Sequence, residues 1–195
     1  QLDQVLSSLN TDLNGHYLFG GSVVDQPPVG TMDTIMNGSG SLAGFKTVAA
    51  QRLQADEGTD NMGRLTLSTT ADTVTVAQDN ANFGYTPTGI TTSDPSAISV
   101  TAPSGTPPSL SVQFASQPAA GDTVGITLGL PDGTSTSLTM TAVTGTPANP
   151  GEFQIGADTA TTAANFQAAL TSSIQSATPS TLAAASNYAA ANSFF

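Results

Sequence analysis

The chain has 195 residues, of which 38% are hydrophobic and only 9% are charged, with 14 acidic residues, 3 basic residues and no cysteine. The net charge of −11 argues against nucleic-acid binding, which depends on basic contacts to phosphates, and the lack of cysteine excludes disulfides and thiolate metal sites. No stretch approaches the 18 apolar residues of a membrane-spanning helix, so we expect no membrane insertion.

An amphipathic helix is predicted at the start of the chain. Its apolar residues recur at spacings of three and four: Leu2, Val5, Leu6, Leu9 and Leu13. Asn14–Gly15 ends this helix, because both residues tolerate a left-handed backbone. Residues 1–13 have the pattern of the last turns of a longer helix, and Phe194–Phe195 carries no stop signal. We therefore expect the chain to be a fragment.

Turns and a second helix follow. Residues 17–19 form a short extended run, and Pro27–Pro28 keeps the next segment open. Residues 37–41 are predicted to be a loop. A second helix is expected over about 42–57, and Gly58 ends it.

After Arg64 the hydrophobic period changes from about 3.6 residues to two, which predicts β-strands. The runs that begin at Leu65 and Val74 lie in opposite phase, so a turn or bulge is expected near 70–72. The later strand-like runs are 98–100, 110–114, 124–130, 138–142 and 153–155. Between the third and fourth of these runs, Pro131–Asp132–Gly133 supplies a tight turn, which predicts a β-hairpin.

Two more helices are predicted near the C-terminus. Asp158 is expected to cap a helix over 158–177, whose apolar stripe includes Phe166. Thr178–Pro179 is a cap followed by a proline in the first turn, so an Ala-rich helix is expected to begin there.

These elements predict an α+β fold. A helical base, formed by residues 1–64 and 179–195, carries an inserted domain over 65–178. The inserted domain is an antiparallel β-domain rich in Thr and Ser, with one covering helix.

Motifs for catalysis are weak. His16 is the single histidine and follows a helix stop, so we interpret it as a turn or interface residue. No G-x-S-x-G nucleophile elbow exists, and the glycine-rich segment 38–44 is one residue too long for a phosphate loop. The acidic pairs, Asp56–Glu57 and Glu152 with Asp158, are interpreted as solvated side chains. We therefore expect that the chain is not an enzyme and that it has no catalytic residue, no metal site and no cofactor.

One segment has a long and unusual pattern. Its residues are Leu9–Asn10, Asn14–Gly15–His16–Tyr17–Leu18–Phe19–Gly20–Gly21, Asp25 and Pro27–Pro28–Val29. This segment resembles the "LN…NGRYLFGG…PPV" stretch of the flagellin family, which comprises flagellins and the hook–filament junction protein, in its alphaproteobacterial form. Further matching residues are Asn37–Gly38–Ser39–Gly40, Arg52, Ala55–Asp56, Gly63–Arg64–Leu65 and the Ala-rich end from Leu182 to Phe195. His16 replaces the usual Arg, and residues 66–178 match the family only in general character.

The resemblance implies a structural subunit of the bacterial flagellum that lacks the terminal assembly helices. Such a subunit is exported by the flagellar type III system, with a chaperone, and is extracellular. It assembles with other flagellin-family subunits, as a homopolymer or with junction or cap proteins, whereas the fragment itself is expected to be monomeric. Flagellin and junction protein are not distinguished. The turn residues His16, Tyr17, Leu18, Phe19, Gly20, Gly21, Pro27 and Pro28 are expected to pack the helical base, with direct contact between subunits as the alternative.

Two other functions stay open. A secreted adhesin or carbohydrate-binding module would present exposed aromatic residues. The aromatic candidates are Phe83, Tyr85, Phe114 and Phe153, of which the last two are expected in the core. A polysaccharide hydrolase would need converging carboxylates or a basic groove. The basic residues are Lys46, Arg52 and Arg64, so the β-region contains none.

Overall fold

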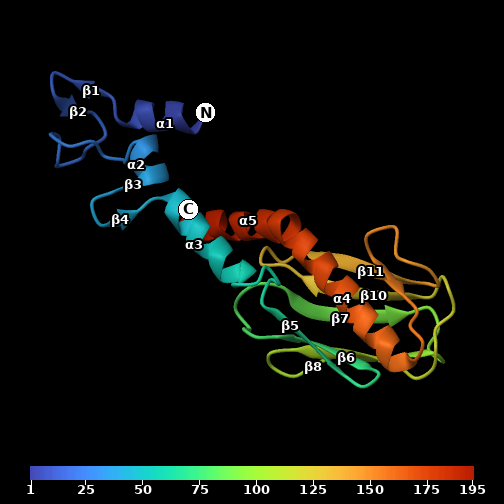
Figure 1. Cartoon of the computed structure of the whole chain (residues 1–195). Coiled ribbons are helices and arrows are strands. Elements are labelled where there is room, and N and C mark those ends of the chain that lie inside the picture. Colours follow the sequence, from blue (N-terminus) through green and yellow to red (C-terminus); the bar gives the residue numbers. More distant parts are fainter. The chain divides into compact units, whose positions relative to one another are not determined.

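A computed structural model describes residues 1–195 and shows a mixed α+β protein (Figure 1). The predicted α+β class is therefore confirmed. The chain divides into two units: Gln1–Gln51 with Ala190–Phe195, called here the small unit, and Arg52–Ala189, called the β-rich unit. Residues 52–64 and 179–189, which are predicted in the helical base, belong to the β-rich unit in the structure.

The small unit contains short helices and two-residue strands. Its elements are α1 (Leu2–Leu9), β1 (Asp12–Leu13), β2 (His16–Tyr17), α2 (Met32–Asn37), β3 (Gly38–Ser39), β4 (Leu42–Ala43) and the first turns of α3 (Phe45–Glu57). The ring of Phe45 contacts the rings of Phe194 and Phe195, with centroids 5.6 and 5.9 Å away. The last residues of the chain thus pack with its first third.

Two predicted boundaries in the small unit are wrong. The first helix ends at Leu9 and not at Leu13, because Leu13 pairs with His16 in a tight hairpin. The second helix begins at Phe45, because Leu42–Ala43 pairs with Gly38–Ser39 as a strand. Helix α2 was not predicted at all.

The β-rich unit contains two four-stranded sheets. One has the order β5-β6-β9-β8, with β5 (Leu65–Thr70), β6 (Thr73–Gln78), β9 (Ser109–Phe114) and β8 (Ile98–Ser104). The other has the order β12-β11-β10-β7, with β12 (Glu152–Gln154), β11 (Ser135–Val143), β10 (Thr123–Gly129) and β7 (Thr86–Thr92). All neighbours are antiparallel except β11 and β12, which are parallel and correct the purely antiparallel prediction. The predicted hairpin of β10 and β11 is confirmed.

Helix α4 (Thr159–Ala177) packs against strands of both sheets (Figure 1). Its predicted cap is confirmed, because Asp158 Oδ1 accepts a hydrogen bond from the Thr161 N–H at 2.7 Å. The Phe166 ring enters the core between Phe114 and Phe153, with centroids 5.6 and 5.2 Å away. Removing such a fully buried aromatic side chain typically costs about 3–5 kcal/mol, so this cluster is a main source of stability.

The predicted new helix at Thr178 is not separately capped. Residues Thr178–Leu182 form a wide π turn (η1) that joins α4 to α5 (Ala183–Phe194). The Thr178 hydroxyl donates backward to the Ile174 carbonyl at 2.9 Å, and its backbone is helical, with φ −58° and ψ −51°. An N-terminal cap has a non-helical backbone, so the helix continues through Thr178 and does not begin there. None of the helices has both the length and the apolar character needed to cross a membrane.

Candidate functional site

The residues predicted as an interface turn lie in the loop between α1 and α2. The hairpin of β1 and β2 turns through Asn14 and Gly15, whose φ angles are 55° and 82°. A two-residue turn with both φ values positive matches the twist of a β-hairpin. Asp12 Oδ2 accepts a hydrogen bond from the Gly15 N–H at 3.2 Å and holds this turn.

Asn10 closes the loop by binding the backbone of Val29 in both directions. The Asn10 Nδ2 donates to the Val29 carbonyl at 2.9 Å, and the Val29 N–H donates to Asn10 Oδ1 at 3.2 Å. These are the first and last parts of the unusual sequence pattern. The structure therefore brings residues separated by 19 positions into one closed loop, called here the 10–29 loop.

Inside the 10–29 loop the backbone is further tied to itself. The Tyr17 N–H donates to the Val24 carbonyl at 2.7 Å, and the Val23 N–H donates to the Gly20 carbonyl at 3.1 Å. A Cβ on Gly20 would lie 2.3 Å from the Val23 carbonyl oxygen, so only glycine fits. Steric crowding in this fold therefore explains the presence of glycine at position 20 of the motif.

The apolar side chains of the 10–29 loop point largely to solvent. Leu18 is 60% exposed and Phe19 is 61% exposed. The exposed large hydrophobic residues of the small unit are Leu2, Val5, Leu13, Leu18, Phe19, Val23, Val24, Leu42 and Phe195. Its buried hydrophobic residues are Leu6, Ala49 and Ala190. The small unit thus leaves far more large apolar side chains exposed than it buries. Exposed apolar side chains in such number are typical of an interaction surface.

Of the other predicted turn residues, Tyr17 and Gly20 are partly buried, and His16, Gly21, Pro27 and Pro28 are exposed. The structure thus brings all eight into one loop, and most of them face solvent. The sequence pattern located the loop, but it did not reveal the tie between Asn10 and Val29.

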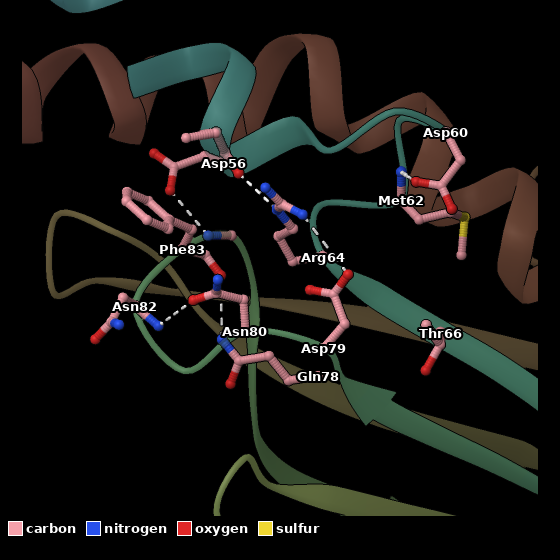
Figure 2. A network of polar contacts seen from close by, with 12 residues as sticks. Asp56, Asp60, Met62, Arg64, Thr66, Gln78, Asp79, Asn80, Asn82 and Phe83 are labelled. Carbon is pink, nitrogen blue, oxygen red and sulfur yellow. Dashed lines mark hydrogen bonds and ion pairs between the residues drawn. The ribbon is translucent and has the colours of Figure 1, made fainter. Parts of the chain in front are cut away.

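A second group of matching residues meets in the β-rich unit, around the end of α3 (Figure 2). Asp56 is 0% exposed, and its Oδ2 accepts a hydrogen bond from Arg52 Nε at 2.8 Å. Its Oδ1 accepts one from the Gly84 N–H at 2.9 Å. The interpretation of Asp56 as a solvated acid is therefore wrong, because both oxygens are bound inside the protein. The i,i+4 spacing of Arg52 and Asp56 on a predicted helix was the signal for this pair.

Arg64 binds the same helix end from the other side. Its Nε donates to the Ala55 carbonyl at 2.7 Å, and its guanidinium lies 3.7 Å from Asp79 Oδ2 (Figure 2). A cation beside the last carbonyls of a helix is favourable, because the helix dipole is negative there. We call Arg52, Asp56, Arg64, Asp79 and Gly84 the α3 clamp.

Glycines make the α3 clamp sterically possible. Gly63 and Gly84 have φ angles of 58° and 77°, which other residues adopt only with strain. A Cβ on Gly84 would lie 2.2 Å from the Gly63 carbonyl oxygen, and a Cβ on Gly63 would lie 2.3 Å from Cδ2 of Tyr85. The two backbone segments that contain Gly63 and Gly84 therefore approach each other so closely that neither position has room for a Cβ.

No protein-family model, curated protein or solved structure matches this chain.

The candidate catalytic and metal-binding side chains are dispersed over the structure. No group of three or more His, Cys, Asp or Glu side chains is placed to share a metal ion. His16 is exposed in its hairpin. The pKa of Glu152 is lowered by the Asn149 side chain and neighbouring backbone N–H groups, and that of Asp158 is lowered mainly by the Thr161 N–H. Each of these two carboxylates thus binds its own turn.

The aromatic candidates for a carbohydrate platform are not presented together on a surface. Tyr85, Phe114 and Phe153 are buried. Phe83 is partly buried, and the Arg52 guanidinium lies 5.3 Å from its ring centroid. Three of the four rings are thus enclosed in the core, and the fourth has the Arg52 guanidinium beside it.

Proposed function

We propose that this chain is a structural, self-assembling subunit of the bacterial flagellum, of the flagellin family, and not an enzyme. The observation that carries the proposal is the exposed apolar surface of the small unit, above all Leu18 and Phe19 in the 10–29 loop. Apolar side chains that one chain leaves uncovered are stabilised when other subunits cover them. Repeated contact between different surfaces of identical subunits generates a filament.

The places of the matching residues support this proposal. Many of the residues that resemble flagellins belong to two structural devices: the pattern from Asn10 to Val29 forms the 10–29 loop, and Arg52, Asp56 and Arg64 belong to the α3 clamp. Gly20 and Gly63 occupy positions where a Cβ would clash. The resemblance therefore follows constraints that the fold itself imposes.

The β-rich unit suits the role of an outer domain that faces solvent. From residue 65 onward it has no basic residue, and its acidic residues are Asp72, Asp79, Asp94, Asp122, Asp132, Glu152 and Asp158. A surface of one charge sign disfavours close association between such domains. Assembly contacts are accordingly assigned to the small unit.

The proposed partners are other flagellin-family subunits, in the filament or at its junction with the hook, together with an export chaperone. The proposed location is extracellular, after export through the flagellar type III apparatus.

A chimera tests the proposal. Residues 1–195 would replace the corresponding segment of an alphaproteobacterial flagellin, between its own terminal helices, in a strain without flagellin. We expect filaments by electron microscopy and restored swimming. Export of a folded, stable chimera without any filament would refute the proposal.

Matched variants locate the assembly surface. The double substitution L18S/F19S should abolish or shorten the filaments, because it removes the exposed apolar side chains of the 10–29 loop. Tyr188→Ser changes a side chain of the β-rich unit that is 59% exposed, and it should leave filament length unchanged. Equal filament lengths for both variants would contradict the assigned surface.

A further inference from the structure

One sheet of the β-rich unit has an edge that its last strand covers only in part. Strand β12 pairs with residues Thr141, Ala142 and Val143 of β11. Strand β11 begins six residues earlier, at Ser135. Gly151 also lies against the Thr139 carbonyl, because a Cβ there would be 2.8 Å from that oxygen. The open edge is therefore the first part of β11, residues 135–138, which is a template for an added strand.

Hydrogen bonds show which backbone groups face this edge. The Thr141 N–H donates to the Gly151 carbonyl, and the Val143 carbonyl accepts from the Ile155 N–H, both at 2.8 Å. Because backbone groups alternate along a strand, the N–H and C=O of Ser137 point the same way. The even-numbered residues of β11 face β10 instead, as the bond from the Ala142 N–H to the Asp122 carbonyl shows.

A groove of about 860 Å³ lies along the same edge. It is lined by Ser137 to Thr139 of β11, by the segment 147–154 and by α4 from Asn165 to Ala177. The side chains that α4 contributes are small, among them Ala168 and Ser172. A groove bounded by an open strand and a helix face of small side chains has room for an extended peptide.

The charge of the groove indicates which kind of peptide it would bind. Glu152 is the single ionisable side chain that lines the groove. Bonds from the Asn149 side chain and from backbone N–H groups lower the pKa of Glu152, so its carboxylate is charged at neutral pH. No Lys or Arg occurs in the β-rich unit after Arg64. A second copy of this region offers no complementary charge, whereas a partner segment with Lys or Arg does.

We propose that this groove, called the edge groove, binds an extended segment of a partner protein that carries Lys or Arg, as a strand added alongside β11. The edge groove lies wholly in the β-rich unit. The proposal goes beyond flagellar assembly and does not depend on it.

A labelled peptide of alternating Val and Lys, nine residues long, is the probe. We expect saturable binding to the 195-residue chain by fluorescence anisotropy. A peptide with N-methyl groups on alternate residues, on the edge that would face β11, should bind at least about tenfold more weakly, because a strand is recognised through its backbone. A peptide with Glu in place of Lys should also lose about tenfold, because like charges oppose binding.

Two variants on α4 locate the binding. Ser172→Trp fills the edge groove from an exposed position and should weaken binding of the Val–Lys probe at least about tenfold. Ala164→Trp adds the same side chain at an exposed position of α4 that does not line the groove, and it should bind like the parent. Circular dichroism checks that both variants are folded.

The proposal is overturned if the N-methylated and unmodified probes bind equally, which would show attraction by charge alone. It is also overturned if folded S172W binds like the parent. Loss of probe binding in S172W, with protection of the Ser137 amide in the parent complex by hydrogen exchange, supports it.

Discussion

Asp56 Oδ1 lies 2.9 Å from the backbone nitrogen of Gly84, 28 positions along the chain. This bond joins the last turn of α3 to the segment before β7. The other carboxylate oxygen accepts a hydrogen bond from Arg52, so both oxygens of the buried Asp56 carboxylate have a hydrogen-bond donor. Removing one partner of a buried pair is strongly destabilising, because the remaining charged group loses its compensation.

The Asp56→Ala variant should lower the free energy of unfolding by about 3 kcal/mol, because it leaves the Gly84 N–H and the Arg52 guanidinium without their acceptor. Urea unfolding followed by circular dichroism measures the change. Gln54→Ala, at an exposed position of the same helix, is the matched control and should differ from the parent by less than about 0.5 kcal/mol, as for most surface changes. A loss for D56A no larger than that for Q54A would contradict the clamp.

Gly84→Ala should destabilise the β-rich unit by more than about 3 kcal/mol, because its Cβ would sit 2.2 Å from the Gly63 carbonyl oxygen. Gly133→Ala is the control with a similar φ of 84° and no atom within 4 Å of the added Cβ. This control carries only the left-handed backbone strain of about 1–2 kcal/mol. Thermal unfolding of both variants separates the clash from the strain, and equal losses would refute the steric argument.

Tyr85 makes stability depend on alkaline pH. Burial raises the pKa of its phenol above 10.0, and the Thr178 side chain offsets this rise only in part. The folded state therefore favours the neutral phenol, so the stabilisation is complete below pH 10 and is lost as the pH rises through the raised pKa. We expect Tyr85→Phe to remove this decline above pH 10, with urea midpoints as the measurement.

Tyr188→Phe is the control for that experiment, because Tyr188 is 59% exposed and should leave the alkaline decline unchanged. An unaltered decline in Y85F would mean that another group causes it.

Asn10→Ala should open the 10–29 loop. It removes both hydrogen bonds to Val29, which together contribute about 1–3 kcal/mol to the local closed state. Hydrogen exchange of the Val29 amide should become faster, with little change in the core amides of the β-rich unit. Ser22→Ala, at an exposed position of the same loop, should leave this exchange rate unchanged.

Elements with local signals were predictable from the sequence. The turn 131–133 fixed the hairpin of β10 and β11, and the Asp158 cap with its apolar stripe fixed α4. The opposite phases of Leu65 and Val74 predicted a turn, which the structure places at 71–72 with a φ of 51° for Ala71. In each case neighbouring residues alone determine the backbone.

Features that depend on distant residues were not predictable. Strand β7 has the sequence TPTGITT, which lacks an apolar alternation, and it forms because β10 pairs with it. Thr178–Pro179 has the pattern of a helix start, yet the helix continues through a wide turn there. Asp56 gave no sign of burial, because its second partner is a backbone N–H far along the chain.

The tie between Asn10 and Val29, with the bonds inside it, holds the 10–29 loop in one shape before any partner arrives. A binding segment that is ordered in advance loses little conformational entropy on association. In the proposed assembly, Leu18 and Phe19 would therefore contribute most of the free energy of their burial directly to affinity. Weakening the tie should therefore lower the affinity of the proposed contact even when every contact residue is kept.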